Sequence, residues 1–143
     1  MPGEQVLLDS DAFVGWLVAH DAHHTRMLQV LDAMRQDRIQ PLTTNLVVAE
    51  TATMLSYRMS HTHAVRFLKL AASVRTVLIN QELHERTLEI FARQTRNKTS
   101  FVDLANVAVM QALNIPWIVS FDKTYAHDFG LTTYPATLEI SVG

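Results

Sequence analysis

The sequence contains no cysteine, which excludes disulfide bonds, thiolate nucleophiles and zinc–thiolate sites. It has only four glycines, and none lies between Gly15 and Gly130, so it has no glycine-rich loop of the kind that binds nucleotide phosphates. A G-x-S-x-G motif is also missing, which argues against the nucleophile elbow of serine hydrolases. The chemistry of this chain must therefore come from other polar side chains.

Long apolar runs are scarce as well. The first ten residues, MPGEQVLLDS, carry no basic group and only three consecutive apolar residues, which is unlike a signal peptide. The most apolar stretch, residues 104–119, is interrupted by Asn106, Gln111, Asn114 and Pro116, too often for a membrane span. We therefore expect a cytoplasmic protein with no membrane partner.

The composition that remains is globular. Of the 143 residues, 48% are hydrophobic and 18% are charged, and no repeat or low-complexity segment divides them. This predicts a single domain over residues 1–143. The formal net charge is −2, so a polyanion such as RNA would have to be held by a local basic patch or by bound metal.

Short strand-like runs alternate with segments of helical spacing along the chain. The expected strands are Val6–Leu8, Pro41–Thr43, Val74–Ile79, Trp117–Phe121 and an edge strand at Thr132–Tyr134. The expected helices are Ser10–Ala19, His24–Arg35, Leu46–Met59, His61–Ala72, Gln81–Thr95 and Phe101–Leu113. This alternation predicts an α/β fold with a parallel central sheet covered by helices. Ligands of such sheets bind at the carboxyl ends of the strands.

Two aspartates fall directly at predicted strand ends. Asp9 follows the first strand, and Asp122 follows the most strand-like run in the chain. Each also has a purely structural reading, because Asp9 or Ser10 could cap a helix and an aspartate after a strand is common in turns. Asp11 would lie in the first turn of the next helix, where a negative charge is favoured anyway.

Glu50 is a charged residue within an apolar helical segment, NLVVAETATML. Helical geometry places it on one face with Leu46 and Met54. A glutamate on a buried stripe is costly unless a cation or hydrogen-bond donor meets it. We expect a metal ion to do so, and a buried salt bridge to Arg58 or Arg66 is the alternative.

Asp103 stands in the sequence Ser100-Phe-Val-Asp103, which has the form of a helix capping box. The helix that follows is apolar on nearly every face, so Asp103 should begin inside the protein near the strand ends. Ser100 could order a water or ligand there, and Asn106 faces the same way one turn later. Four acids would then converge, and oxygen-only ligands favour Mg²⁺ or Mn²⁺.

Taken in order, the segments LLDSDAF, NLVVAETATML, SFVDLANVAVM and VSFDKTY resemble the PIN domain, and within it the VapC-type toxins of toxin–antitoxin pairs. The resemblance implies a three-layer α/β/α fold in which Asp9, Glu50, Asp103 and Asp122 are the successive acids of the site. Ser100 and Ser120 match the small hydroxyl residues that precede the last two acids. Asp11 departs from the family, which usually has a small residue there, and Asp128 has no assigned place.

The resemblance also implies an activity. Members of this family hydrolyse RNA phosphodiester bonds with water as the nucleophile and leave a 3′-hydroxyl product. One or two Mg²⁺ or Mn²⁺ ions would activate the water and neutralise charge on the phosphate. A homodimer and a small antitoxin that blocks the site are further expectations from the resemblance.

Two groups of side chains outside the acids could also have a functional role. The cations Arg93, Arg96 and Lys98 precede Asp103, and Lys123 follows Asp122. They could guide the RNA backbone into the site, although an ordinary solvated helix end would look the same. The run His20-Asp-Ala-His-His24 is more simply a solvated loop with a helix cap at Asp21 than a metal site.

Three other functions fit part of the pattern. The triplet Asp9-Ser10-Asp11 after a strand mimics the nucleophile motif of haloacid-dehalogenase-like phosphatases, but the late strand offers the single acid Asp122 rather than a pair. A receiver-like signalling domain would need an aspartate after a central strand, where this chain has Asn80. The third is a PIN-like scaffold that binds RNA or protein without cleaving; a missing acid would favour it, and none is missing.

Overall fold

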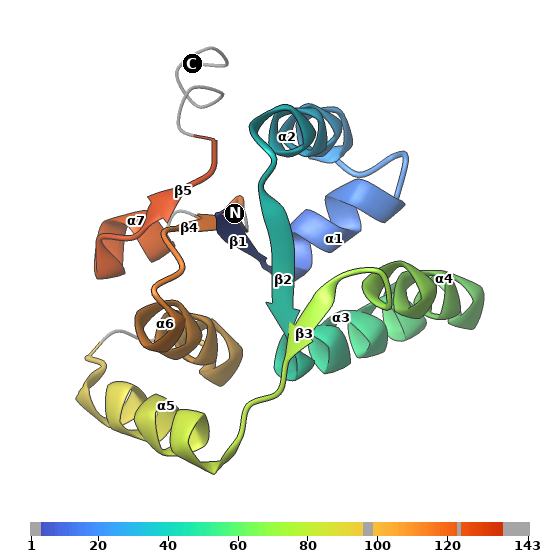
Figure 1. Ribbon diagram of the computed structural model, residues 1–143. Helices are drawn as coiled ribbons and strands as arrows, with labels where there is room; N and C mark the ends of the chain where they lie inside the picture. Colours follow the sequence, from blue (N-terminus) through green and yellow to red (C-terminus); the bar gives the residue numbers. More distant parts are fainter. Residues whose placement is uncertain (1–3, 96–98, 123, 136–143) are drawn as a thin grey trace.

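A computed structural model describes residues 4–95, 99–122 and 124–135 (Figure 1). Its sheet has the strand order β3-β2-β1-β4-β5, and every neighbouring pair is parallel. The strands are β1 (Gln5–Leu8), β2 (Gln40–Thr44), β3 (Arg75–Val77), β4 (Trp117–Val119) and β5 (Thr132–Thr133). The predicted parallel sheet is therefore confirmed, with β5 at one edge as expected.

Helices cover both faces of this sheet. One layer contains α1 (Ser10–Leu17), α2 (His24–Asp37), α3 (Asn45–Arg58) and α4 (His61–Ala71). The other contains α5 (Gln81–Arg93), α6 (Phe101–Leu113) and α7 (Thr124–Phe129). Figure 1 shows the two layers on opposite sides of the strands, which confirms the three-layer α/β/α fold. Among the described helices, none has the length and apolar character needed to cross a membrane.

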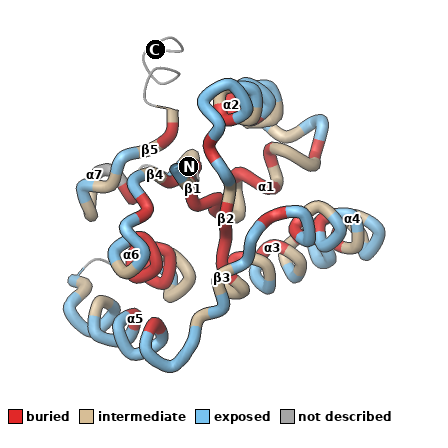
Figure 2. Tube along the Cα trace, viewed as in Figure 1, coloured by how far each residue is buried: buried red, intermediate tan, exposed pale blue. Residues whose placement is uncertain are grey.

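The core divides into two parts because side chains alternate along the central strands. Val6 and Leu8 pack with α1–α4, whereas Leu7 between them packs with α5–α7. All three are fully buried, and burial of such a side chain stabilises a fold by roughly 1.5–3 kcal/mol. Figure 2 shows the buried residues concentrated on the strands and on the helix faces toward them. A sheet covered on both faces leaves its strand ends as the place for polar chemistry.

Hydrogen bonds bring the carboxyl ends of β1 and β4 together. Leu8 pairs with Val119 in the parallel register, and the backbone N–H of Asp9 donates to the carbonyl of Val119 at 3.1 Å. On the other side of β1, the buried hydroxyl of Thr43 donates to the carbonyl of Leu8 at 3.0 Å. As predicted, Asp9 and the segment leading to Asp122 emerge from neighbouring strands at the same edge.

Polar residues mark where the helices begin. The hydroxyl of Thr44 caps α3 by accepting a hydrogen bond from Val47 N–H at 3.1 Å. The side chain of Asn80 caps α5 through Leu83 N–H at 2.9 Å. The strand expected over Val74–Ile79 is accordingly shorter, because the chain turns into this cap after Val77.

Candidate active site

Asp9 is the centre of the polar cluster at the ends of β1 and β4. It occupies the N-cap position of α1, but its carboxylate makes no capping hydrogen bond. Oδ1 instead accepts from the side-chain amide of Asn106 at 3.2 Å, and Oδ2 lies 3.4 Å from the Ser120 hydroxyl and 3.0 Å from the Tyr125 hydroxyl. Only 5% of Asp9 is exposed. The interpretation of Asp9 as a simple helix cap is therefore wrong.

The environment of Asp9 disfavours its negative charge. Burial first, and then the nearby charges of Asp11 and Asp103, raise the pKa of Asp9 from 3.8 to about 7, although hydrogen bonds from the Ser10 backbone and the Tyr125 hydroxyl oppose the increase. A cation bound at this position would favour the ionised form of Asp9, because it interacts favourably with carboxylates that otherwise repel each other.

Tyr125 joins two of the predicted acids and was missed by the sequence analysis. Its fully buried hydroxyl lies 3.0 Å from Asp9 Oδ2 and 2.9 Å from Asp103 Oδ1, and it accepts from Asn106 Nδ2 at 3.0 Å. Burial, followed by the charges of the two aspartates, raises the pKa of Tyr125, so the hydroxyl keeps its proton. That single proton can be donated to only one of the two carboxylates at a time.

Asp103 forms the predicted capping box, and its second carboxylate oxygen contacts Tyr125. Its N–H donates to the Ser100 hydroxyl at 3.1 Å, and its Oδ2 accepts from Ser100 N–H at 3.3 Å, which completes the capping box of α6. The other oxygen, Oδ1, faces Tyr125. The cap therefore fixes the start of a buried helix and presents one carboxylate oxygen to the cluster.

Asp11 is more than a favourable charge at a helix start, and that interpretation is corrected. Its Oδ2 accepts from Phe121 N–H at 2.8 Å and lies 3.3 Å from the Ser120 hydroxyl. Its Oδ1 is buried and has no hydrogen-bond partner in the described residues. Burial raises the pKa of Asp11, and the hydrogen bond from Phe121 opposes this. Asp11 thus anchors the segment after β4 beside Asp9.

Glu50 lies at the site, but not on the buried stripe that we expected. The buried face of α3 is formed by Val47, Thr51 and Leu55, whereas Glu50 itself is exposed. Because Leu46, Val47 and Val48 are all apolar, the sequence pattern did not determine which of them faces the core. No arginine pairs with Glu50 in the described part of the chain, which argues against the salt-bridge alternative.

The charge of Glu50 nevertheless interacts with the cluster. Desolvation raises the pKa of Glu50, a hydrogen bond from the Ser10 side chain opposes this, and the charge of Asp103 adds to the increase.

Asp122 is exposed at the end of β4, and its N–H donates to the Ser120 hydroxyl at 3.1 Å. The structure thus gathers Asp9, Asp11 and Asp103 closely, with Glu50 nearby and Asp122 adjoining through Ser120.

Of the four predicted RNA-binding cations, Arg93 lies within the described residues. Arg93 is exposed and lies 3.6 Å from the carboxylate of Glu89, one turn earlier on α5. Arg96, Lys98 and Lys123 lie outside the described residues. Asp128, on α7, is partly buried.

Carboxylate oxygens are suitable ligands for a hard divalent cation such as Mg²⁺. In this structure, however, the described acidic side chains are not arranged around a single metal position. Across residues 4–95, 99–122 and 124–135, no three acidic or histidine side chains are already grouped for metal coordination. The Tyr125 hydroxyl instead lies between Asp9 and Asp103. Two observations still fit a cation: the raised pKa of Asp9, and the buried Oδ1 of Asp11, which has no hydrogen-bond partner among the residues that the structure describes.

Comparisons with known proteins agree with this architecture. Residues 6–128 match the PIN domain family. The 23S rRNA-specific endonuclease VapC20 from two strains of Mycobacterium tuberculosis is 32% identical over 87 residues, which are 59% of this chain. That alignment spans 66% of the length of these relatives, slightly less than two thirds.

Two solved structures share the fold. The crystal structure of Mycobacterium tuberculosis VapC20, described as a toxin that cleaves the sarcin-ricin loop, matches with a TM-score of 0.79 and 26% identity over 89% of this chain and 96% of that one. VapBC2 from Rickettsia felis, bound to a DNA fragment from its promoter, matches with a TM-score of 0.65 and 14% identity. This second match covers 90% of this chain and 96% of the other, and it supports the fold alone.

Proposed function

Because this chain belongs to the PIN domain family, we propose that it is a metal-dependent endoribonuclease and the toxin of a toxin–antitoxin pair. The observation that carries the proposal is the buried Asp9 carboxylate at the junction of β1 and β4, with a pKa raised to about 7 beside Asp11 and Asp103. Like charges held together in this way are typical of functional sites, because a fold gains no stability from them. The phosphatase alternative fits less well. In that reaction Asp9 would be the nucleophile, but its carboxylate is already contacted by three hydrogen-bond donors.

We assign Asp9, Glu50, Asp103 and Asp122 as the residues that hold Mg²⁺ or Mn²⁺. All four offer carboxylate oxygens, which are the preferred ligands of these ions. A bound ion would supply a more acidic water and neutralise charge on the scissile phosphate. Asn106 and Ser120 orient the Asp9 carboxylate by hydrogen bonds to its two oxygens, so Asp9 is fixed before substrate arrives.

The reaction itself is the attack of water on a phosphodiester. The water oxygen bonds to phosphorus, the bond to the 3′ oxygen breaks, and that oxygen takes up a proton to become the 3′-hydroxyl. Arg93, Arg96, Lys98 and Lys123 remain proposed contacts to the RNA backbone. Ribosomal RNA is the first substrate to test, since the similar endonuclease VapC20 is named for its action on 23S rRNA. A homodimer and a protein antitoxin belong to the same proposal.

Cleavage of RNA by the purified protein tests this function. With ribosomal RNA and a mixed RNA pool as substrates, we expect cutting with Mg²⁺ or Mn²⁺ and none with EDTA. Asp9→Asn should abolish cutting, whereas the matched control Asp32→Asn, an exposed acid on α2 paired with Arg35, should cleave like the wild type. Folded wild-type protein that turns over phosphate monoesters but leaves every RNA intact would favour the phosphatase instead.

A further inference from the structure

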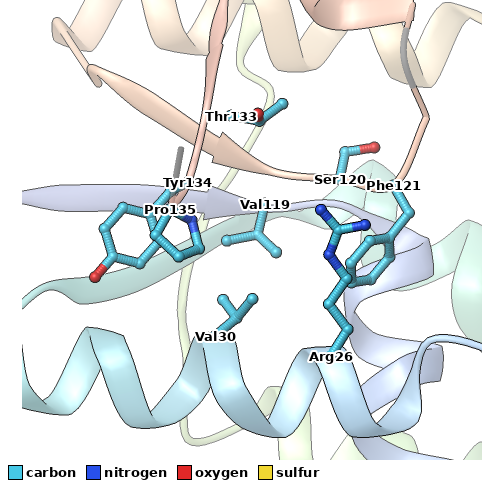
Figure 3. A pocket seen from close by; sticks show the side chains of 8 residues that line it. All are labelled: Arg26, Val30, Val119, Ser120, Phe121, Thr133, Tyr134 and Pro135. Carbon is cyan, nitrogen blue, oxygen red and sulfur yellow. The ribbon is translucent and has the colours of Figure 1, made fainter. Parts of the chain in front are cut away.

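A small hollow lies beside the acid cluster, on the side of β4 that faces α2. Arg26 reaches into it from α2, and Ser120 and Phe121 border it from the end of β4 (Figure 3). Ser120 is also the residue whose hydroxyl lies 3.4 Å from Asp9 Oδ2. One residue therefore separates the hollow from the centre of the proposed active site.

Arg26 is held in place by an aromatic ring. Its guanidinium carbon lies 5.6 Å from the centre of the Phe121 ring, within the range of a cation–π contact. Phe121 is itself fixed, because the His23 ring stacks on it with centres 4.2 Å apart and an interplanar angle of 8°. The Phe121 N–H also donates to Asp11 at 2.8 Å. These contacts set the position of the guanidinium relative to the acids.

The Arg26 charge has no acidic partner in the described residues. Arg35, Arg86 and Arg93 each pair with a carboxylate on their own helix, whereas Arg26 forms no ion pair within residues 4–95, 99–122 and 124–135. The first turn of α2 likewise contains no acid. A ring contact occupies the face of a guanidinium and leaves its N–H groups directed outward from the edge. Arg26 can therefore still bind an anion.

We propose that Arg26, positioned by Phe121, binds a phosphate of the RNA backbone next to the bond that is cut. This inference rests on the proposed ribonuclease function. The chain has a net charge of −2 and concentrates acids at the site, so flanking phosphates need a local cation. The planar fork of arginine matches two phosphate oxygens, and such contacts position a nucleic acid without reading its sequence.

Arg26 differs in its contacts from the cations that we predicted from the sequence to bind RNA. Arg93 already pairs with Glu89 on α5, in the opposite helix layer. His23 belongs to a histidine run that we interpreted as a solvated loop, yet it is partly buried and stacks on Phe121. The His23 ring therefore supports the Phe121 ring that Arg26 contacts.

Binding of intact RNA isolates this contact. In an Asp9→Asn background, which should not cleave, the affinity for a fluorescein-labelled RNA is measured by anisotropy with Mg²⁺ at several salt concentrations. Adding Arg26→Gln should weaken the Kd about five- to tenfold and reduce the slope of log Kd against log salt by about one. Arg26→Lys keeps the charge but loses the planar fork, so its Kd should lie between that of the background variant and that of the variant with Arg26→Gln.

Arg38→Gln is the matched control, because Arg38 is exposed at the opposite end of the same helix. It should leave the Kd and the salt slope unchanged. Equal effects of Arg26→Gln and Arg38→Gln, no effect of Arg26→Gln, or no RNA binding by the background variant would each overturn the inference. If wild-type protein cleaves RNA and Arg26→Gln binds it normally, only the phosphate contact is wrong. If binding depends on Arg26 while wild-type protein cleaves no RNA, the ribonuclease function is wrong, and the inference fails with it because there is no cut bond beside the contact.

Discussion

The hydroxyl of Tyr125 lies 3.0 Å from Oδ2 of Asp9, and through it a carboxylate at the end of β1 is linked to α7 and to Asp103 on α6. A neutral hydroxyl between two acids lowers their mutual repulsion while no cation is bound. A bound metal ion would lower the repulsion between these carboxylates in the same way. We therefore predict that the stability of the protein and metal occupancy of the site are coupled through Tyr125.

Tyr125→Phe tests that coupling. Loss of the hydroxyl should lower the free energy of unfolding by about 1–2 kcal/mol in EDTA, and by less in saturating Mn²⁺, where the ion screens the carboxylates. Thermal unfolding in the two conditions measures both values. Tyr134→Phe is the control, because the Tyr134 hydroxyl donates to Asp37 at 2.6 Å, away from the acids. Its effect should be the same with and without Mn²⁺, and a metal-independent loss in Tyr125→Phe would contradict the coupling.

The pKa of Asp9, about 7, predicts how metal affinity changes with pH. Below pH 7 a cation must displace a proton from Asp9, so the apparent affinity should fall up to about tenfold per pH unit. Above pH 7 this dependence should disappear. Calorimetric titration with Mn²⁺ in two buffers of different ionisation enthalpy, at pH 6 and pH 8, measures both the affinity and the protons released. Equal affinity and no proton release at pH 6 would show that Asp9 is not a ligand.

The same pKa shift makes a prediction for the metal-free protein. Because the pKa of Asp9 is higher in the folded state than its ordinary 3.8, the folded protein binds more protons than the unfolded chain between about pH 4 and pH 7. Its contribution to stability therefore falls as the pH rises through this window. At pH 8 in EDTA, Asp9→Asn should raise the free energy of unfolding by about 1–3 kcal/mol. Denaturant unfolding at pH 5 and pH 8 checks this, and a variant less stable than wild type at pH 8 would refute it.

Much of the site could be predicted because its signals are local. Asp9 follows an abrupt strand end, and Asp103 stands in a capping box, so each position depends on a few neighbouring residues. The inward-facing side of each helix depends instead on contacts with distant segments. In α4 the buried residues are Ala64, Phe67 and Ala71, whereas their apolar neighbours Val65 and Leu68 are not buried. Neighbouring apolar residues made the helical phase ambiguous, as they also did around Glu50.

Tyr125 illustrates what sequence reasoning could not reach. It belongs to α7, a helix of six residues with too few positions to show a periodic pattern. Its role depends on the spatial convergence of β1, α6 and α7, which no spacing in the sequence encodes. The available signal was its position three residues after Asp122, close enough to reach the same strand end.

Asp11 is predicted to act by positioning the segment after β4. Asp11→Ala removes the acceptor for Phe121 N–H and should cost about 1–3 kcal/mol of stability and slow RNA cleavage about tenfold or more. Asp11→Asn keeps a side-chain oxygen and should retain most of the stability and most of the cleavage rate. Thermal unfolding and single-turnover cleavage rates compare the two variants. If Asp11→Asn is as slow as Asp11→Ala while remaining stable, the charge of Asp11 matters more than its hydrogen bond.

The capping box of α6 should affect catalysis beyond its effect on stability. Ser100→Ala should lower stability by about 1 kcal/mol and also slow cleavage, because Ser100 holds Asp103. Ser60→Ala removes a comparable cap from α4, where the Ser60 hydroxyl accepts from His63 N–H at 3.1 Å. It should cost similar stability with no change in cleavage rate. Equal rates for the two variants would mean that the box is structural only.

The most direct test of the central claim is a crystal structure of the protein soaked with Mn²⁺ and examined for anomalous scattering. The account predicts a peak in contact with the carboxylates of Asp9 and Asp103, with Glu50 or Asp122 completing the ligands, and its loss in Asp9→Asn crystals. No peak at saturating Mn²⁺, or a peak away from Asp9, would contradict a metal-dependent ribonuclease built on these acids.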